Sequence, residues 1–435
     1  LAPPAAQSSA QAGLVGEALG DVPMPAALRT NKLPLVALLT ANAISGVGNV
    51  LTALAVPWFV LQTTGSPTQA GVAGFFAISP VVIASLFGGA LVDRLGHKSS
   101  SIVADVMSSV TVALIPALFA RGALPFWLLL ALVFLGALLD APGQTARTSL
   151  VPDLAERGGV TLERAAAATQ VVNRATGLVG APLAGVLIAA FGAGAALTID
   201  AATFAVSAGL VALAVPALAS RTGMERAGYL AELREGFRFI QSGSLIRAML
   251  LVVVVTNILD AMWSAVVGPV FAERVYGSAV ALGLLFGVSG GGAVAGALAY
   301  GAFGHRWPRR PLFISAFVVV ATRFLLLAML PVLPVALAIQ AVTGAGAGPL
   351  NPIIDATLYE QVPPDMRGRV FGALTAFAFA GMPLGALIAG PLIAAAGLRG
   401  TLVLMGGAYL AATLSMLATP AIRTMERPRS PEAVV

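Results

Sequence analysis

Cysteine is absent from this 435-residue chain, and histidine and charged residues are scarce. Without cysteine, neither a disulfide framework nor a thiolate metal site can form. Two histidines, His97 and His305, are too few to build a metal cluster, so we expect no metal. Charged residues make up only 10% of the chain, against about 25% in soluble globular proteins, which is too little charge to cover a surface that faces water.

Signatures of nucleotide-driven and hydrolytic enzymes are also missing. The chain has no Gly-x-x-x-x-Gly-Lys-Ser/Thr phosphate-binding loop and no His-Glu-x-x-His run. No Gly-x-Ser-x-Gly nucleophile elbow stands in a suitable context. We therefore expect neither a cofactor nor an enzymatic activity.

Apolar sequence is what the chain has in abundance. Hydrophobic residues make up 58% of it, and the mean hydropathy is +0.91. Long unbroken apolar runs favour helices over a transmembrane barrel, whose segments of about ten residues alternate between apolar and polar. Since a helical span takes about 20 residues, the length allows roughly twelve spans. The sequence therefore predicts an all-α membrane protein.

The apolar runs fall into two groups of six. Helices are predicted in the first half, 33–216, near 35–61, 70–92, 100–120, 124–141, 166–190 and 195–216. In the second half, 246–420, they are predicted near 246–271, 279–301, 311–330, 333–357, 367–395 and 399–420. Residues 1–32 and 421–435 are interpreted as cytoplasmic tails, the first disordered. The connector 217–245 contains an amphipathic stretch, 229–240, that predicts a short helix able to lie on the membrane surface.

Lysine and arginine are unequally distributed between alternate loops. With the N-terminus taken as cytoplasmic, the cytoplasmic segments contain 20 basic residues, the outer loops contain three, and two lie inside spans. Such a bias places both termini in the cytoplasm and requires an even number of spans. The net charge of +6 therefore reflects membrane topology and does not indicate nucleic-acid binding.

The two halves resemble one another. Gly96-His97-Lys98 follows the second predicted helix, and Gly304-His305-Arg306 follows the eighth, 208 positions later. Gly180-Ala-Pro182 in the fifth helix matches Gly381-Met-Pro383 in the eleventh, 201 positions later. Two matches in the same order at similar offsets indicate an internal duplication. Duplicated six-helix halves are an established transporter design, with the substrate site between them near the midplane.

The loop after the second helix reads Gly89-Ala-Leu-Val-Asp93-Arg94-Leu-Gly96-His97-Lys98. It resembles the signature loop of the major facilitator superfamily, Gly-x-x-x-Asp-Arg-x-Gly-Arg-Lys, with His97 where that family usually has arginine. The resemblance implies a gate in which Asp93 and Arg94 latch the cytoplasmic side in the outward-open state. A simple topology signal, with basic residues kept inside, is the alternative.

Two other regions resemble particular branches of this superfamily. The fifth helix carries Gly177, Gly180, Pro182 and Gly185, similar to the helix-5 motif of the drug:proton antiporter branch, although ordinary tight packing also accounts for such a pattern. The fourth predicted helix lacks the arginine that many of those antiporters carry. The stretches 348–370 and 140–153 resemble the enterobactin-exporter and macrolide-efflux branch, which exports siderophores and drugs from the bacterial cytoplasm. The resemblance therefore implies a twelve-helix major facilitator fold in the bacterial inner membrane.

Ionisable side chains inside the spans are functional candidates, because burying a charge in hydrocarbon is costly. Asp260 lies midway along the seventh helix, with Asn257 three positions before it and Trp263 three positions after it, so the three can share a face. Because the seventh helix borders the central cavity in this superfamily, Asp260 is the predicted proton-coupling carboxylate, and Asn257 and Trp263 are candidate cavity residues. The alternative is that Asp260 is a structural partner of an arginine or a backbone group.

Four more polar residues lie inside the predicted spans, and each has more than one possible role. Asn42 and Asn49, seven positions apart in the first helix, either contact substrate or join helices. Arg174 is a cavity candidate that can meet an anionic substrate or a carboxylate such as Asp105 or Asp140. Arg323, in a helix peripheral in this family, is expected to make a structural pair or to contact a lipid headgroup.

The remaining aspartates are assigned by their position along the predicted helices. Asp200 is expected near the outer end of the sixth helix, where its carboxylate can stay in contact with water. Asp105, Asp140 and Asp355 are expected near the cytoplasmic ends, in gating networks rather than at the substrate.

Together these features predict a monomeric secondary transporter that exports an amphipathic small molecule, drug or siderophore-like, in exchange for protons by alternating access. Its expected partners are that molecule, protons and membrane lipids. The sequence leaves three alternatives open: an importer, a lipid scramblase or lipid transporter, and a membrane-embedded enzyme on the same scaffold.

Overall fold

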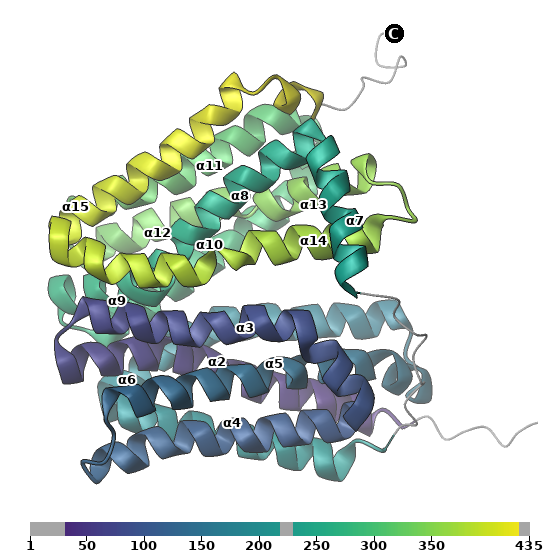
Figure 1. Cartoon of the computed structure of the whole chain (residues 1–435), viewed down its shortest axis with the longest axis vertical. Helices are drawn as coiled ribbons and strands as arrows, with labels where there is room; N and C mark the ends of the chain where they lie inside the picture. Colours follow the sequence, from purple (N-terminus) through teal and green to yellow (C-terminus); the bar gives the residue numbers. More distant parts are fainter. Residues whose placement is uncertain (1–30, 218–228, 426–435) are drawn as a thin grey trace, which may run out of the picture.

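The structure is a computed structural model that describes residues 31–217 and 229–425, without the side chains of 85–91, 93–95, 229–232, 305 and 424. The described residues are helical, with no strand among them. The N-terminal bundle consists of α2 (Leu33–Thr64), α3 (Pro67–Leu95), α4 (His97–Ala120), α5 (Phe126–Arg157) and α6 (Leu162–Ala214). Figure 1 shows this bundle below a second bundle formed by the C-terminal half.

The C-terminal bundle begins with α7 (Tyr229–Ser242), which packs against α14 and α8 and confirms that the amphipathic stretch is a helix. Its further helices are α8 (Ser244–Met262), α9 (Gly268–Phe271), α10 (Ala279–Phe303), α11 (Arg309–Leu327), α12 (Leu333–Ala347), α13 (Leu350–Gln361), α14 (Arg367–Ala380) and α15 (Met382–Ala418). Two π-helical turns, Trp263–Val267 and Ala272–Tyr276, join α8 and α9 into one apolar segment, Ser244–Tyr276. The predicted all-α membrane fold is therefore confirmed.

Ten segments of the described chain are long and apolar enough to cross a membrane. Two of them, Leu162–Ala214 and Arg367–Ala418, have 53 and 52 residues, more than twice the length that one crossing needs. Each is interrupted by a non-helical glycine, Gly192 with φ 82° and Gly397 with φ 69°. Glycine adopts positive φ at no steric cost, so each residue lets its helix reverse, and dividing both segments there yields the twelve predicted spans.

Equivalent turns recur in the two halves. Gly65 ends α2 in the left-handed conformation, and the Ser66 side chain then accepts a hydrogen bond from the backbone N–H of Gln69. In the second half Gly277 and Ser278 repeat the device, with Ser278 accepting from the N–H of Ala281. A glycine stop followed by a serine N-cap satisfies the free backbone groups of both helix ends. The repetition supports the internal duplication inferred from the sequence.

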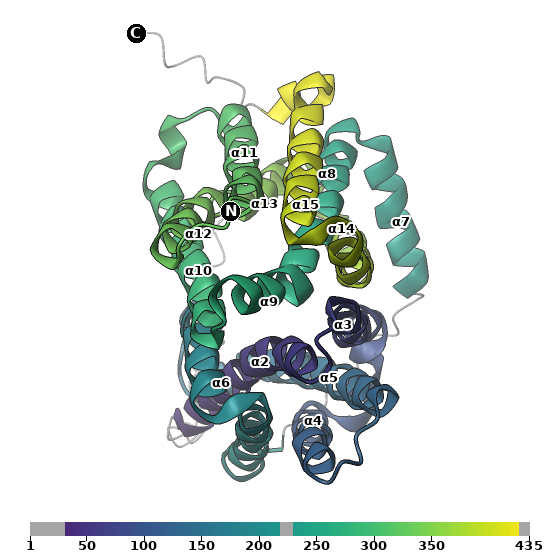
Figure 2. The ribbon, with the colours of Figure 1, turned by 90° about the vertical axis from the view of Figure 1, so that its left-hand side faces the viewer.

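The two bundles meet along two helix pairs, α6 with α10 and α3 with α15, which lie side by side in Figure 2. A Cβ placed on Gly185 in α6 would lie 2.6 Å from the carbonyl oxygen of Ala279 in α10. A Cβ placed on Gly71 in α3 would lie 2.7 Å from the carbonyl oxygen of Ala386 in α15. Gly71 and Ala279 are 208 positions apart, and Gly185 and Ala386 are 201 apart, so the two contacts are related by the duplication.

Replacing Gly185 with valine is expected to lower the free energy of unfolding by about 1–3 kcal/mol, because the added side chain meets backbone that cannot move aside. Gly177, on the same helix, has nothing within 4 Å of its Cβ position and supplies the matched control. Thermal unfolding of the two detergent-purified valine variants would measure the difference. Equal melting temperatures would contradict this close packing between the bundles.

Candidate functional site

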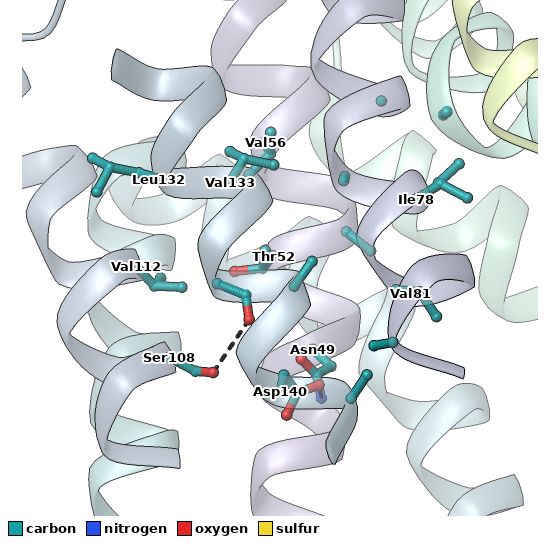
Figure 3. Close-up of a pocket in the computed structure, with 18 of the residues that line it drawn as sticks. Asn49, Thr52, Val56, Ile78, Val81, Ser108, Val112, Leu132, Val133 and Asp140 are labelled. Carbon is teal, nitrogen blue, oxygen red and sulfur yellow. Dashed lines mark hydrogen bonds between the residues drawn. The ribbon is translucent and has the colours of Figure 1, made fainter. Parts of the chain in front are cut away.

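A cavity of about 530 Å³ lies in the N-terminal bundle and reaches the C-terminal half at Ser264 and Ala265. Its wall is mainly aliphatic, with residues such as Val56, Ile78 and Val133. Polar groups are few, and Asn49, Thr52, Asp140 and Gln144 are among them. Figure 3 shows this wall with the Asn49 and Asp140 side chains close together. A mostly apolar cavity with a few polar groups is typical of a site for a small amphipathic molecule.

Asp140 is the charged group of this cavity. Its Oδ2 accepts hydrogen bonds from the Asn49 side-chain amide at 3.1 Å and from the Gln144 amide at 2.6 Å. Its Oδ1 is buried, makes no hydrogen bond, and lies 3.8 Å from Nη2 of Arg147. Gln144 and Arg147 follow Asp140 by four and seven positions on α5, which places all three on one face of that helix.

Arg147 is buried, with 1% of its surface exposed, and its main partner is Asp105 of α4. Its Nη1 donates to Asp105 Oδ1 at 2.6 Å, and the Ser207 hydroxyl of α6 donates to Asp105 Oδ2 at 2.6 Å. The prediction that the fourth helix ends near 141 and carries no buried arginine is wrong. The helix runs through Pro142 to Arg157, so Arg147, counted as cytoplasmic, is instead buried within it.

Asp200 is also buried, with 0% of its surface exposed, and not at a hydrated helix end as predicted. Its side chain accepts hydrogen bonds from the hydroxyls of Thr52 and Thr203. Gly48 on α2 allows this approach, because a Cβ there would collide with the Asp200 carboxylate and with Thr203. The position eight residues beyond the Gly192 bend places Asp200 about two turns inside the helix.

The C-terminal bundle holds a second cavity of about 410 Å³, which also includes Ser264 in its wall. Asp260 lines it, and its Oδ1 accepts from Nη2 of Arg323 at 2.5 Å. The Arg323 side chain is 10% exposed and its guanidinium lies over the rings of Trp263 and Phe324, whereas the Asp260 side chain is 42% exposed. The arginine is therefore held by aromatic packing, and the carboxylate is the partner that faces the cavity.

The neighbours predicted for Asp260 are present, but they do more packing than expected. Trp263 lines the cavity and is nonetheless 3% exposed, with its ring packed against Phe271, Phe286 and Phe324. The Asn257 amide also lines the cavity and donates to the carbonyl oxygen of Ala378 at 2.9 Å. Both residues therefore hold helices together at the cavity wall.

The family follows from a comparison with known proteins. A family profile described as transmembrane secretion effector, within the major facilitator superfamily, matches residues 27–433. The chain belongs to this family.

The multidrug efflux pump Tap of Mycolicibacterium fortuitum is 32% identical over 396 residues, which cover 89% of this chain and 94% of that protein. The enterobactin exporter EntS of Citrobacter koseri is 28% identical over 362 residues, or 82% of this chain and 84% of that one. A crystal structure of the nucleoside transporter NupG matches with a TM-score of 0.70 at 13% identity, covering 88% and 98% of the two chains. The structural likeness shows the fold alone, whereas the sequence relatives confirm the resemblance to the efflux branch.

Two of the predicted cavity residues lie away from both cavities. The Asn42 amide donates to the Asn173 side chain at 3.0 Å, which joins α2 to α6. Arg174 is exposed on α6, and Asp105 and Asp140, suggested as its partners, both face Arg147 instead. Asn49 alone of the predicted first-helix pair reaches the cavity.

The signature loop of the superfamily is described in part. Gly96, with φ 81°, makes the bend between α3 and α4, and the Lys98 ammonium donates to the carbonyl oxygen of Ala212 at 2.8 Å. Nδ1 of His97 is buried and makes no hydrogen bond to any side chain or backbone group that the structure describes. Gly89 lies within α3, whereas the Asp93 and Arg94 side chains lie outside the described part of the structure, so their predicted latch stays a prediction.

The helix-5 motif lies where the two bundles meet. Gly185 faces Gly283 of α10, Pro182 meets Gly287 of the same helix, and a Cβ on Gly180 would lie 3.0 Å from Val50 of α2. Gly177 has open space around its Cβ position. The motif therefore allows α6 to pack closely on both α2 and α10, and its part in antiport stays a prediction.

Proposed function

We propose that this protein is a secondary transporter that exports amphipathic cations from the cytoplasm in exchange for protons. The observation that carries the proposal is Asp140, a carboxylate in the wall of a mostly apolar cavity of about 530 Å³ that reaches the second bundle. The relatives support the direction, since they are named as a multidrug efflux pump and an enterobactin exporter and match most of the chain.

The balance of buried charge favours a cationic substrate. Asp105, Asp140 and Asp200 are buried in the N-terminal bundle, and Arg147 is the buried arginine among the side chains described there. Arg147 bonds Asp105 directly and leaves Asp140 at 3.8 Å. In the other cavity Asp260 and Arg323 compensate each other. A substrate that carries an ammonium group beside an apolar body would satisfy Asp140 and the aliphatic wall together.

Alternating access would use the two helix pairs that join the bundles. The close contacts at Gly71, Gly185 and Gly390 lie within about two helical turns of the Gly65, Gly192 and Gly397 bends, all at one end of the bundles. With both termini in the cytoplasm, this end is the outer one, so the described state is closed on the outside. Transport would require these glycine contacts to separate while the opposite ends approach.

Reconstitution into liposomes tests the proposal. Uptake of ethidium, a fluorescent amphipathic cation, is expected when a pH gradient is imposed across the membrane and to stop when an ionophore collapses that gradient. In detergent, the protein is expected to bind tetraphenylphosphonium at least about tenfold more tightly than tetraphenylborate, which has the same shape and the opposite charge. Tighter binding of the borate, or ethidium flux indifferent to the gradient, would refute the proposal, and lipid exchange between leaflets would favour a scramblase instead.

A further inference from the structure

Asp200 is a buried carboxylate to which the transport mechanism above gives no role. Its side chain accepts from the Thr52 and Thr203 hydroxyls, and no ion pair to it is found among the described side chains. Hydroxyl groups can stabilise a carboxylate by hydrogen bonding but cannot neutralise its charge. An ionised carboxylate buried without a positive partner is costly, and the usual remedy is that it holds a proton.

The helices packed against Asp200 bring no positive charge to it. From Leu33 to Thr64 α2 has no ionisable residue, and α10 has only Tyr300, which lies near its far end. The ionisable groups nearest to Asp200 on α4 and α5 are Asp105 and Asp140, and the positive charge of Arg147 is bonded to Asp105. Asp140, a second carboxylate, acts on Asp200 electrostatically. The charges around Asp200 therefore disfavour a second negative charge.

Thr52 connects Asp200 to the substrate cavity. The threonine lines the cavity wall, donates to Asp200 Oδ2, and lies three positions from Asn49, which bonds Asp140. One face of α2 thus carries both the contact to Asp140 and the contact to Asp200. A hydroxyl can accept one proton while it donates another, so Thr52 provides a path between Asp200 and water in the cavity.

We infer that Asp200 is a proton-binding site of this transporter, and that a cationic substrate bound at Asp140 expels its proton into the cavity through Thr52. This inference rests on the proposed function. The reason is electrostatic: a cation beside Asp140 cancels the charge that repels the ionised form of Asp200, so the proton leaves as the substrate arrives. Proton and substrate then compete for the same negative field, which is the exchange that an antiporter requires.

The proton on Asp200 can be observed directly by infrared difference spectroscopy of the detergent-purified, full-length protein. Adding tetraphenylphosphonium is expected to remove the carbonyl band of one protonated carboxylic acid. Asp200→Asn should lack this band from the start, because asparagine carries no acidic proton, so the same addition should produce no such change in its spectrum. Glu156→Gln, at an exposed position on α5, supplies a matched loss of one carboxylate and should behave like the wild type.

Binding measured against pH is the second readout. Tetraphenylphosphonium affinity of the wild type is expected to rise with pH, by up to about tenfold per pH unit if one proton is released on binding. The affinity of Asp200→Asn should change less with pH. Thr52→Val should keep the band but slow its loss in stopped-flow measurements, since the path to the cavity is then broken.

The failure of this inference differs from the failure of the proposed function. If ethidium flux follows the pH gradient but Asp200→Asn loses the same band on ligand addition as the wild type, the proton lies elsewhere and the inference is wrong. A sodium ion at Asp200 would leave the carboxylate ionised, so the absence of that band from the wild type would also overturn it. If tetraphenylphosphonium does not bind at all, the proposed function fails first.

Discussion

Arg147→Met is expected to lower the free energy of unfolding by about 3–5 kcal/mol, because it leaves the buried Asp105 without its positive partner. Arg147 and Asp105 have side chains 2% and 0% exposed, and their 2.6 Å bond is supported by the Ser207 hydroxyl. Asp140 would lose the same cation at 3.8 Å. Thermal and denaturant unfolding in detergent would measure the loss, and a low yield of folded protein would be its first sign.

A second variant distinguishes the loss of the Arg147–Asp105 charge pair from a general loss of packing in the core. Arg147→Met combined with Asp105→Leu removes both charges, and replacing a buried ion pair by apolar groups is often neutral or stabilising. The double variant should therefore recover most of the lost stability. Arg369→Met breaks the exposed pair with Glu235, 44% and 51% exposed, and should cost no more than about 1 kcal/mol. If Arg147→Met proves as mild as Arg369→Met, the buried pair does not hold α4 and α5 together.

The burial of Arg147 is a feature that the sequence did not predict. Unbroken apolar runs were enough to predict the helices, because the bilayer requires a fixed span length and leaves few alternatives. The stretch Asp140-Ala-Pro142-Gly143 reads as a helix end, since proline and glycine are poor helix formers. In the folded chain the helix continues to Arg157, so Arg147 lies inside. Reading Asp140, Gln144 and Arg147 at a spacing of four and seven would have indicated one helical face.

The sequence also could not predict which residues on different helices contact one another. Asp260 and Arg323 are 63 positions apart, and nothing in the sequence specifies that they meet at 2.5 Å. Periodicity places a residue on a face of its own helix but does not say which face of another helix it meets. Asp200 shows the same limit, since its partner Thr52 lies 148 positions away. The glycine contact of Gly185 with α10 likewise depends on how the two bundles dock.

Asp260→Asn is expected to abolish ethidium transport driven by a pH gradient while leaving a folded protein. Asparagine keeps an oxygen that can accept from Arg323 at the same place, so the pair retains a hydrogen bond. It cannot take up or release a proton, so a step that needs Asp260 to change charge stops. Flux in proteoliposomes with an imposed gradient would measure the effect, and exchange of labelled ethidium at equal concentrations without a gradient would show whether the binding site survives.

A purely structural role for the Asp260–Arg323 pair predicts a different pattern, and the double variant Asp260→Asn with Arg323→Gln separates the two. If the pair serves only to neutralise charge, removing both charges together should restore gradient-driven flux. If Asp260 carries a proton, driven flux stays lost in the double variant although the protein is stable. Arg323 lies over the rings of Trp263 and Phe324, whereas its partner is the half-exposed carboxylate facing the cavity. Restored flux would therefore assign Asp260 to the architecture and leave the exchange of proton for substrate to the N-terminal bundle.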